Sequence, residues 1–416
     1  MFGKLYNNLL ARNALWMFAG YGTRSVIQAS YFIVLARSLG ADGYGAFVGA
    51  AALVTIITPF ASLGYERLLI KNVARNLELF ERYWGNALLM TLLCGSFLIV
   101  IVMFLSQYLL PNTIPALLVL FVAVADMLFT QILGVSGHAF LAFQRLGWTA
   151  QFQVLLSLSK LIAALGLALL VASPTPVQWG LMYLLSAIVS ASIGFLIVRR
   201  KLGAPIPDPA RITSELKEGF YFSIDQSSIY IYNDADKTML ARLSTLEAAG
   251  IYAAAYRLVD MSLTPIMSLL YATYARFFQH GSGGIGSSLS FAKRFLPYAG
   301  AYGLLAGVAL FLAAPLLPYL LGSDFDNASE AIRWLAPLPF LRAMRSFVAD
   351  ALTGAGFQGF RSTVQVSIAL FNVFLNFLLI PIYSWRGAIW ATIVSDSLLL
   401  IGLFMVAWHI RRKERV

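Results

Sequence analysis

The sequence has few charged residues and a single cysteine. Asp, Glu, Lys and Arg make up 12% of the chain, which is about half their usual share in soluble proteins, whereas apolar residues make up 59%. A composition this poor in charge excludes an ordinary soluble domain and indicates an integral membrane protein. Because Cys94 has no partner cysteine, an intrachain disulfide and a cysteine-based metal cluster are excluded, and we expect no metal site.

Long apolar segments, in contrast, recur along the whole chain. A helix needs about 20 predominantly apolar residues to cross a bilayer. Six such segments lie near 13–36, 44–64, 84–109, 116–141, 150–172 and 179–198, and six more lie near 219–240, 251–275, 295–321, 331–356, 363–381 and 387–408. We therefore predict an all-α integral membrane protein with twelve transmembrane helices joined by short loops.

The distribution of Lys and Arg indicates an orientation. If the N-terminus is cytoplasmic, the cytoplasmic segments hold 20 of these residues and the outer loops hold three, namely Arg37, Arg242 and Arg386. Positive residues favour the cytoplasmic side of a membrane. We expect an inner-membrane, multi-pass protein with both termini in the cytoplasm. The net charge of +11 follows from this topology, so no nucleic-acid partner is needed.

A short sequence occurs twice, about half the chain apart. Residues 35–45 read LARSLGADGYG and residues 240–252 read LARLSTLEAAGIY. Six spans in each half orient both halves alike, which predicts two parallel-repeat, six-helix lobes around a central cavity. We expect an N-lobe over 1–198, a cytoplasmic linker over 199–217 and a C-lobe over 218–416. Each copy should end the first helix of its lobe.

Several basic and amide side chains fall inside the predicted spans, where charge is unfavourable unless it faces water or a partner. Arg24 and Gln28 are spaced i,i+4 on one helix face, and Arg342 begins a polar stripe with Arg345 beside it. Arg257 and Asn372 lie on two further polar faces. We expect these six residues to line the cavity and bind substrate.

Carboxylates in the spans are candidates for ion coupling. They are Asp126, Asp225, Asp236, Asp260 and Asp350, and Asp396 is a sixth. The alternative is that acids and bases neutralise one another as structural pairs. Asp234 and Lys237, like Arg257 and Asp260, have the i,i+3 spacing that allows pairing within one helix. Both interpretations remain open from the sequence.

Three segments carry a resemblance to a known family. They are NALWMFAGYGTRSVIQASYFIVLARSLGADGYGAF at 13–47, YNDADKTMLARLSTLEAAGIYAAAYRL at 232–258 and LGSDFDNASEAIRWLAP at 321–337. They resemble the polysaccharide transporter family of Wzx-type O-antigen flippases, whose superfamily also holds the multidrug and toxin extruders and the lipid II flippase. Arg24 and Arg257 stand where the similar lipid II flippases carry cavity arginines.

The resemblance implies alternating access that moves an undecaprenyl-diphosphate-linked oligosaccharide outward through membrane lipid for surface polysaccharide synthesis. It implies no enzymatic activity and no cofactor. Either a coupling ion, H⁺ or Na⁺, or the membrane potential can drive the lobe closure, and the sequence does not distinguish between them. It also allows a polysaccharide polymerase and a chain-length regulator as partners. Lipid II flippases usually have two further C-terminal spans, whereas this sequence ends at RRKERV after the twelfth, so lipid II is not the expected substrate.

Three other functions compete with the flippase. An ion-coupled drug or small-molecule antiporter of the same fold should favour carboxylates over several deep arginines in its cavity. A membrane enzyme acting on the same lipid typically needs a sizeable outer loop or domain, and the expected outer loops are about ten residues or shorter. A scaffold in a polysaccharide assembly complex is compatible with the sequence as an additional role.

Overall fold

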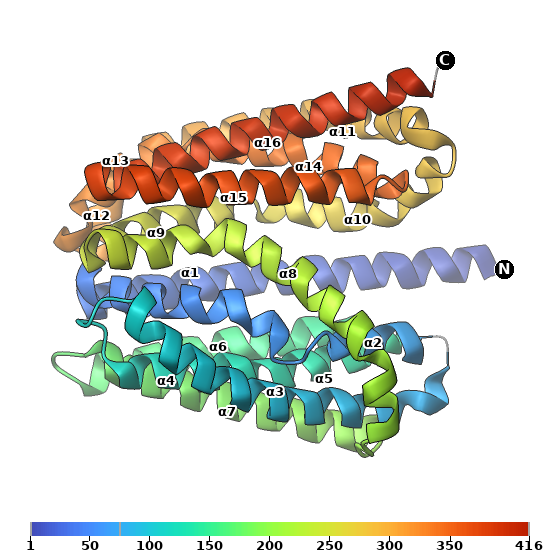
Figure 1. Ribbon diagram of the computed structural model, residues 1–416, viewed down its shortest axis with the longest axis horizontal. Helices are drawn as coiled ribbons and strands as arrows, with labels where there is room; N and C mark the ends of the chain where they lie inside the picture. The colour runs from blue at the N-terminus through green and yellow to red at the C-terminus, as the bar shows by residue number, and fades with distance from the viewer. Residues whose placement is uncertain (1, 75, 415–416) are drawn as a thin grey trace. The chain divides into compact units, whose positions relative to one another are not determined.

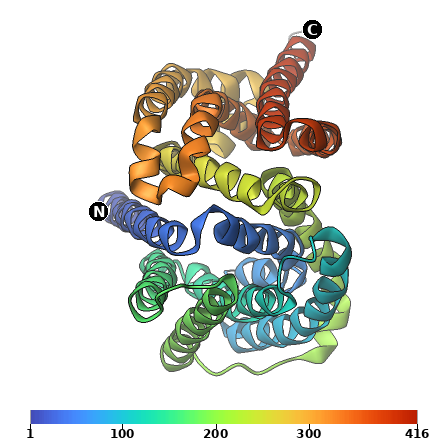
Figure 2. The same ribbon diagram turned by 90° about the vertical axis from the view of Figure 1, so that its left-hand side faces the viewer.

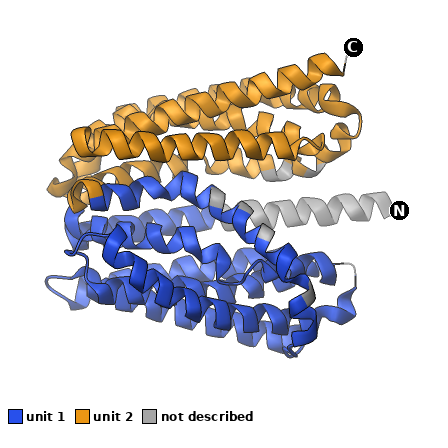
Figure 3. Ribbon diagram, viewed as in Figure 1, with its two compact units in different colours: residues 1–242 blue, residues 243–416 orange. Residues whose placement is uncertain are grey.

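The computed structural model describes the backbone of residues 2–74 and 76–414. Side chains are described for the same residues except 2–21, Ser214, Tyr221, Asp225, Ser228, Tyr271, Ala272 and Ala275. The described residues form helices and no strands. They divide into two compact units, residues 1–242 and residues 243–416, which we call unit 1 and unit 2 (Figure 3).

Unit 1 contains the first eight α-helices of the chain (Figure 1). In order, its elements are α1 (Phe2–Ile57), η1 (Thr58–Phe60), α2 (Tyr65–Val73), η2 (Leu77–Leu79), α3 (Phe80–Leu109), α4 (Ala116–Val124), η3 (Ala125–Thr130), α5 (Gln131–Ala142), α6 (Leu146–Leu170), α7 (Pro176–Lys201) and α8 (Pro209–Leu243). The element η3 is a π-helical turn that joins α4 to α5.

Each copy of the repeated sequence contains a helix break. In the first copy the break is at Gly40 of α1, whose φ of 67° and ψ of 179° belong to a region of backbone conformation that is essentially restricted to glycine. In the second copy, α8 ends at Leu243 and the next helix begins at Leu246. In each copy the Leu-Ala pair is buried and the following arginine is exposed. The helix end expected in each copy is therefore present.

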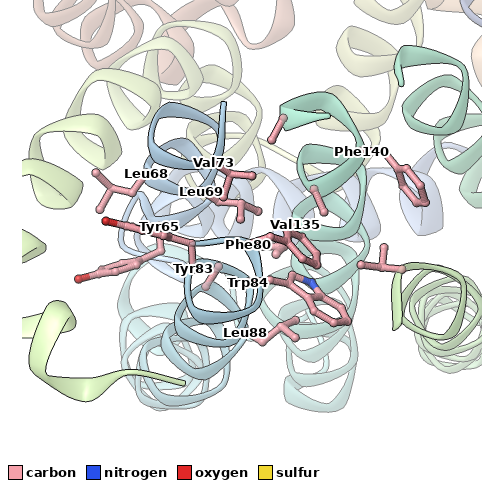
Figure 4. Close-up of a cluster of buried hydrophobic side chains, with 14 of the residues drawn as sticks. Tyr65, Leu68, Leu69, Val73, Phe80, Tyr83, Trp84, Leu88, Val135 and Phe140 are labelled. Atoms are coloured by element: carbon pink, nitrogen blue, oxygen red, sulfur yellow. The ribbon is translucent and has the colours of Figure 1, made fainter. Parts of the chain in front are cut away.

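The core of unit 1 joins the short helix α2 to longer helices. Figure 4 shows buried side chains of α2, α3 and α5 meeting in one cluster, with Phe80 stacked on Trp84 at a centroid distance of 5.6 Å. Tyr65, Leu68 and Leu69 of α2 have no exposed surface. This short helix is therefore stabilised by tertiary packing, because an isolated nine-residue helix is marginal in water.

Helix α8 packs along α1, η1 and α2. The Ser227 hydroxyl donates to the Ile56 carbonyl at 2.7 Å, and the Ser223 hydroxyl donates to the Pro59 carbonyl at 2.9 Å. Gly49 of α1 lies so close to α8 that a Cβ there would be 2.8 Å from Cβ of Ala241. These contacts place α8 in unit 1, whereas the sequence-based division assigns residues from 218 onward to the C-lobe. That division stays a prediction.

The predicted linker, residues 199–217, contacts the start of α3. The Asn86 amide donates to the Asp208 carbonyl at 3.1 Å and accepts from its backbone N–H at 2.6 Å. The Tyr83 hydroxyl donates to Glu215 at 2.6 Å, and the Ile206 N–H donates to the Glu81 carbonyl at 2.9 Å. The linker is thus hydrogen-bonded to unit 1 at several points.

Unit 2 holds the remaining helices. In order, its elements are α9 (Leu246–Ser262), α10 (Thr264–Gly281), α11 (Gly284–Ala313), η4 (Ala314–Leu316), α12 (Leu317–Leu321), η5 (Ser323–Phe325), α13 (Asp326–Leu335), α14 (Leu338–Gly354), α15 (Gln358–Tyr383) and α16 (Trp385–Lys413). Helices α15 and α16 lie side by side in both views (Figures 1 and 2). Helix α14 packs against α10, α11 and α16, so its side chains reach several neighbours.

Many helices are long and apolar enough to cross a membrane. Among the described residues, eight helical segments meet this requirement of length and composition: Gly22–Phe60, Leu77–Leu109, Ala116–Ala142, Leu146–Leu170, Pro176–Lys201, Gly284–Leu321, Gln358–Tyr383 and Trp385–Lys413. They expose large apolar side chains such as Leu169 and Ile382, as expected for helices in contact with lipid. The predicted all-α membrane fold is confirmed, but the count of twelve spans is not.

Candidate functional site

Two arginines of α14 lie at the centre of a charged cluster in unit 2. Arg342 and Arg345 are three residues apart, so both side chains leave the helix on the same side. The exposed fractions of the two side chains are only 7% and 17%. Guanidinium groups removed from water to this extent need partners, because an uncompensated buried charge is strongly destabilising.

Asp396 of α16 is the partner that the two arginines share. Nε of Arg342 donates to Oδ2 of Asp396 at 2.9 Å, and Nη1 of Arg345 lies 3.2 Å from Oδ1. Each carboxylate oxygen thus pairs with one guanidinium, and the Asp396 side chain has no exposed surface. Charge-assisted contacts of this kind are short and directional. Asp396 therefore fixes the positions of both arginines from inside the unit.

Helix α9 supplies the remaining contacts of Arg342. Nη1 donates to Oδ1 of Asp260 at 3.1 Å, and Nη2 donates to the hydroxyl of Tyr256. The Tyr256 ring lies against the guanidinium, with Cζ 4.7 Å from its centroid, within the range of a cation–π interaction. Tyr256 is buried, whereas the Asp260 side chain is 52% exposed.

We call Arg342, Arg345, Asp396, Asp260 and Tyr256 the Arg342 cluster. It joins α9, α14 and α16, with a buried end at Asp396 and an exposed end at Asp260. The two formal positive charges of the arginines are balanced by two formal negative charges of the aspartates. An added anion would give the cluster a net negative charge. The cluster is therefore suited to binding an anion only when one of its carboxylates moves away from the arginines.

Asp350 lies outside this cluster although it is also on α14. Its Oδ1 is 3.5 Å from Nη1 of Arg361, and the same Nη1 donates to the Thr353 hydroxyl at 2.7 Å. Arg361 belongs to the first turn of α15. Asp350 therefore joins the end of α14 to the start of α15, away from Arg342.

Asn372 of α15 is buried between α15 and α16. Its amide nitrogen donates to the Ser395 hydroxyl at 3.1 Å, and its oxygen accepts from the Asn376 amide at 2.9 Å. These bonds use both ends of the Asn372 amide within the helical bundle. Ser395 is the residue before Asp396, so the amide ladder supports the part of α16 that carries the cluster's buried carboxylate.

Unit 1 has a separate polar chain at its π-helical turn. Asp126 of η3 accepts from the Tyr183 hydroxyl of α7 at 2.8 Å and from the Thr130 hydroxyl at 3.3 Å. The Tyr183 hydroxyl itself accepts from the Lys160 ammonium of α6 at 2.8 Å. A carboxylate, a phenol and an ammonium group are thereby linked in series, an arrangement that is able to hold or pass a proton.

Four other predicted site residues lie on α1, α8 and α9. Arg24 and Gln28 are partly buried on α1, one turn from each other, and Arg257 is partly buried on α9, one turn before Asp260. Asp236 of α8 is 2% exposed, and its carboxylate accepts from the Lys237 backbone N–H at 2.8 Å. Asp225 lies outside the described residues.

Helical spacing predicts the ion pair between Asp234 and Lys237 but not the ion pair between Asp260 and Arg342. The Asp234–Lys237 pair is confirmed as a contact within α8. The structure also shows an ion pair between Asp260 and Arg342, 82 residues away on another helix, which the spacing does not predict. Asp396 is the only acidic residue of α16, which indicates weakly that it has a function or a partner, but the sequence does not predict which residues it contacts. No sequence pattern predicted that Tyr183 would link Asp126 and Lys160.

The sequence matches the protein family described as "Polysaccharide biosynthesis protein" over residues 10–279, which is well over half of the chain. No curated protein sequence matches it significantly. The match covers α1 to α9 and most of α10, and therefore includes unit 1 and the Asp260 and Tyr256 side of the Arg342 cluster.

Several solved transporter structures are similar over nearly the whole chain. The inward-facing conformation of a multidrug resistance MATE family transporter of the MOP superfamily gives a TM-score of 0.79 at 13% identity, covering 97% of this chain and 99% of that chain. An outward-facing conformation from the same family gives 0.61 at 15% identity, covering 97% and 96%. A MOP superfamily transporter from Pyrococcus furiosus also gives 0.61 at 15% identity, with coverage of 97% and 96%.

These identities are low, so the structural similarity concerns the fold. The structures that share this fold are described as transporters, and a shared fold alone does not establish a function. The apolar helices described above make it a multi-pass membrane protein. The chain therefore belongs to the polysaccharide biosynthesis protein family, as a multi-pass membrane protein whose fold is similar to that of transporters of the MOP superfamily.

Proposed function

We propose that the chain is a flippase that moves a polyprenyl-diphosphate-linked oligosaccharide from the cytoplasmic to the outer face of the membrane. One observation carries this proposal: a sequence family of polysaccharide biosynthesis has a transporter fold. Intermediates of polysaccharide synthesis that are assembled on a membrane lipid must cross the bilayer before they are used outside. A transporter in such a pathway has this step to perform.

The arginines of α14 support a diphosphate-bearing substrate. A guanidinium group is always charged and presents several donors in a plane, which matches the oxygens of a phosphate. Arg342 lies beside the half-exposed Asp260, so a ligand that reaches Asp260 also comes close to Arg342. In the proposal Arg342 binds the diphosphate and Arg345 adds positive potential, while Arg24, Gln28, Arg257 and Asn372 remain sequence-based candidates for the same task.

Transport needs a source of free energy. A charge crossing the membrane gains about 2.3 kcal/mol per 100 mV of membrane potential. In the proposal H⁺ or Na⁺ supplies the coupling at a buried carboxylate. The linked series of Asp126, Tyr183 and Lys160 supports a proton more than a metal ion, because the ammonium already provides a positive charge there. Asp236 and Asp350 are further candidates.

The proposal places the protein in the cytoplasmic membrane with both termini in the cytoplasm. The Lys and Arg of its loops support this orientation. A polysaccharide polymerase would act on the flipped product, so it is the partner that the proposal implies next, together with a chain-length regulator. Membrane lipid surrounds the exposed apolar helices.

Drug antiport is the second candidate function, because similar structures include multidrug resistance transporters. Another similar structure is described by the phrase "reverse polarity of binding pocket suggests different function". That description concerns a different protein, but it supports the view that the cargo varies within this fold. The two buried arginines of α14 argue against a cationic drug as cargo.

A complementation experiment tests the proposal. In cells lacking the gene, wild-type protein should restore surface polysaccharide, and Arg342→Ala should abolish restoration because the diphosphate loses its donor. Arg333→Ala is the matched control, since Arg333 is an exposed arginine of unit 2 outside the Arg342 cluster. Protein in the membrane fraction is quantified by immunoblot for every variant.

Arg342→Lys and Arg24→Ala complete the series. If charge alone matters, Arg342→Lys should restore part of the export, whereas a planar two-donor contact predicts none. Normal export by both alanine variants would overturn the assignment of arginines to the substrate site. Restored drug resistance without restored polysaccharide would favour the antiporter.

A further inference from the structure

Arg342 is held between two carboxylates that differ greatly in burial. Asp396 has no exposed side-chain surface and contacts both arginines, whereas the Asp260 side chain is 52% exposed and contacts Arg342 through one oxygen. We propose that Asp260 is an internal counter-ion that neutralises Arg342 until the substrate phosphate displaces it. This inference rests on the proposed flippase function. Asp396 is then the positioning residue that keeps Arg342 in place during the exchange.

The two carboxylates differ in how easily they can leave. Moving Asp396 would separate two ion pairs inside the unit and take from both guanidinium groups the fully buried partner that they share, which is strongly unfavourable. Moving Asp260 breaks its contact with Arg342 at 3.1 Å, and the side chain of Asp260 already reaches solvent, where ion pairs are weak. A side-chain rotation of Asp260 is therefore the easiest change that opens the cluster.

The released carboxylate would still have a positive neighbour. Arg257 precedes Asp260 by three residues on α9, and this spacing places the two side chains on the same helix face. When Asp260 rotates away from Arg342, its carboxylate thus stays close to a positive charge. The guanidinium of Arg342 keeps its contacts with Asp396 and Tyr256 and gains a free Nη1 donor toward the exposed side.

The charge count of the cluster makes the exchange favourable for an anion only. With Asp260 in place, the two arginines and two aspartates carry no net formal charge. When Asp260 has moved away, the remaining side chains carry one net positive charge that attracts phosphate. Return of Asp260 would compete with the bound phosphate and assist its release. The same carboxylate therefore lowers affinity and speeds dissociation, a combination that suits a transporter better than tight binding.

A binding measurement on the full-length protein in detergent tests the exchange. The probe is farnesyl diphosphate, and farnesol, which lacks phosphate, is its control ligand. Asp260→Asn removes the competing charge at nearly constant size, so it should lower the Kd for farnesyl diphosphate about tenfold, equivalent to about 1.4 kcal/mol, and leave farnesol binding unchanged. Asp260→Glu keeps the charge and should behave like wild type. Asp324→Asn is the matched control, as an exposed aspartate of η5.

The rate of polysaccharide export distinguishes a role of Asp260 in substrate release from a purely structural role. If Asp260 assists release, Asp260→Asn should bind the probe more tightly but export polysaccharide more slowly than wild type. A destabilised protein would lose both binding and export, and thermal unfolding of the same samples identifies that case. Asp260→Glu should rescue the export rate.

The outcomes separate this inference from the function on which it rests. If wild type binds farnesyl diphosphate but Asp260→Asn binds it equally or more weakly, the counter-ion role is wrong while the flippase stands. If neither protein binds the probe and Arg342→Ala exports normally, the phosphate site and the inference fall together. Tighter binding by Asp324→Asn as well would show an effect of overall charge and would also overturn the counter-ion role.

Discussion

Asp396 shows at the scale of one residue how a charge is accommodated within an apolar bundle. It lies in a helix whose neighbouring residues are mostly apolar, and its two oxygens contact two arginines of α14. Ser395, beside it, accepts from Asn372 of α15. One turn of α16 thereby joins three helices by polar contacts, so the Arg342 cluster is part of the framework of unit 2 as well as a candidate site.

Replacing Asp396 should therefore destabilise the protein strongly. Asp396→Ala leaves two guanidinium groups without their buried partner, and we expect a loss of about 3–5 kcal/mol in the free energy of unfolding. Thermal unfolding of the purified protein in detergent measures the change. Asp324→Ala, at an exposed position, should change stability little. Equal melting temperatures for wild type and Asp396→Ala would contradict the structure of the cluster.

A second ion pair of unit 2 predicts a dependence on pH. Arg386 donates Nε to Oε1 of Glu330 at 2.9 Å and Nη2 to Oε2 at 2.8 Å, and these bonds lower the pKa of Glu330 below its usual value. Because the folded-state pKa is lowered, the pair stabilises the protein fully above the unfolded pKa of about 4.3 and is lost as pH falls through the lowered folded value.

The variant Glu330→Gln tests this dependence. At neutral pH its melting temperature should be below that of wild type, and the difference should disappear as the solution is acidified below the ordinary carboxylate range. Both side chains are largely exposed, so the effect should be small and should decrease with added salt. A difference that persists in acid would exclude the ion pair as its cause.

The sequence predicted the site at residue scale only in part. Polarity in an apolar segment is visible from the sequence, which is why Arg342, Arg345 and Asp260 are predicted to need partners or water. Their pairing was not predictable, because contacts between α9, α14 and α16 depend on tertiary packing that helical spacing does not encode. Spacing succeeded for Asp234 and Lys237 because both lie on one helix.

Helices were easier to predict than contacts, since a long apolar segment in lipid must satisfy its backbone hydrogen bonds internally. The expected span 84–109 lies within α3, and 363–381 lies within α15. Helix α2 and the π-helical turn η3 were not predicted. The first is short and held by the core around Trp84, and the second interrupts an apolar segment without a change in composition.

The close contact between α1 and α8 gives a prediction at the scale of elements. A side chain at Gly49 would meet Ala241, so Gly49→Val should force the helices apart and cost about 1–3 kcal/mol in the free energy of unfolding. Gly166→Ala in α6 is the control, because a Cβ there meets nothing within 4 Å and alanine favours the helix. The comparison of the two melting temperatures measures the contact, and similar values would show that α1 and α8 are not closely packed.

For the whole molecule, the division of Lys and Arg between loops predicts an orientation that a labelling experiment can check. Cys94 is the only cysteine, so a Cys94→Ser background allows single cysteines to be placed at will. A membrane-impermeant thiol reagent added to intact cells should label Asn112→Cys in an outer loop and leave Lys217→Cys in the cytoplasmic linker unlabelled. Permeabilised cells should label both. The reverse pattern would overturn the topology.

The sequence repeated at 35–45 and 240–252 is a feature of the whole chain that depends on the order of residues and cannot be seen in the composition. Both copies have a buried Leu-Ala pair, an exposed arginine and a helix break. The two copies thus share their local structure, whereas the division into two six-helix lobes stays a prediction, because the compact units divide at residue 242 and keep α8 with unit 1. The sequence assigns the chain to a polysaccharide biosynthesis family and the structure gives its fold, whereas the transported substrate is a proposal that a transport experiment must test.

The most direct measurement is the sidedness of lipid-linked oligosaccharide in oriented membrane vesicles, probed with an impermeant glycosidase. We expect the oligosaccharide to accumulate on the cytoplasmic face in vesicles from cells that lack the gene or carry Arg342→Ala, and to reach the outer face with wild type or Arg333→Ala. An unchanged distribution in the absence of the gene would contradict the flippase.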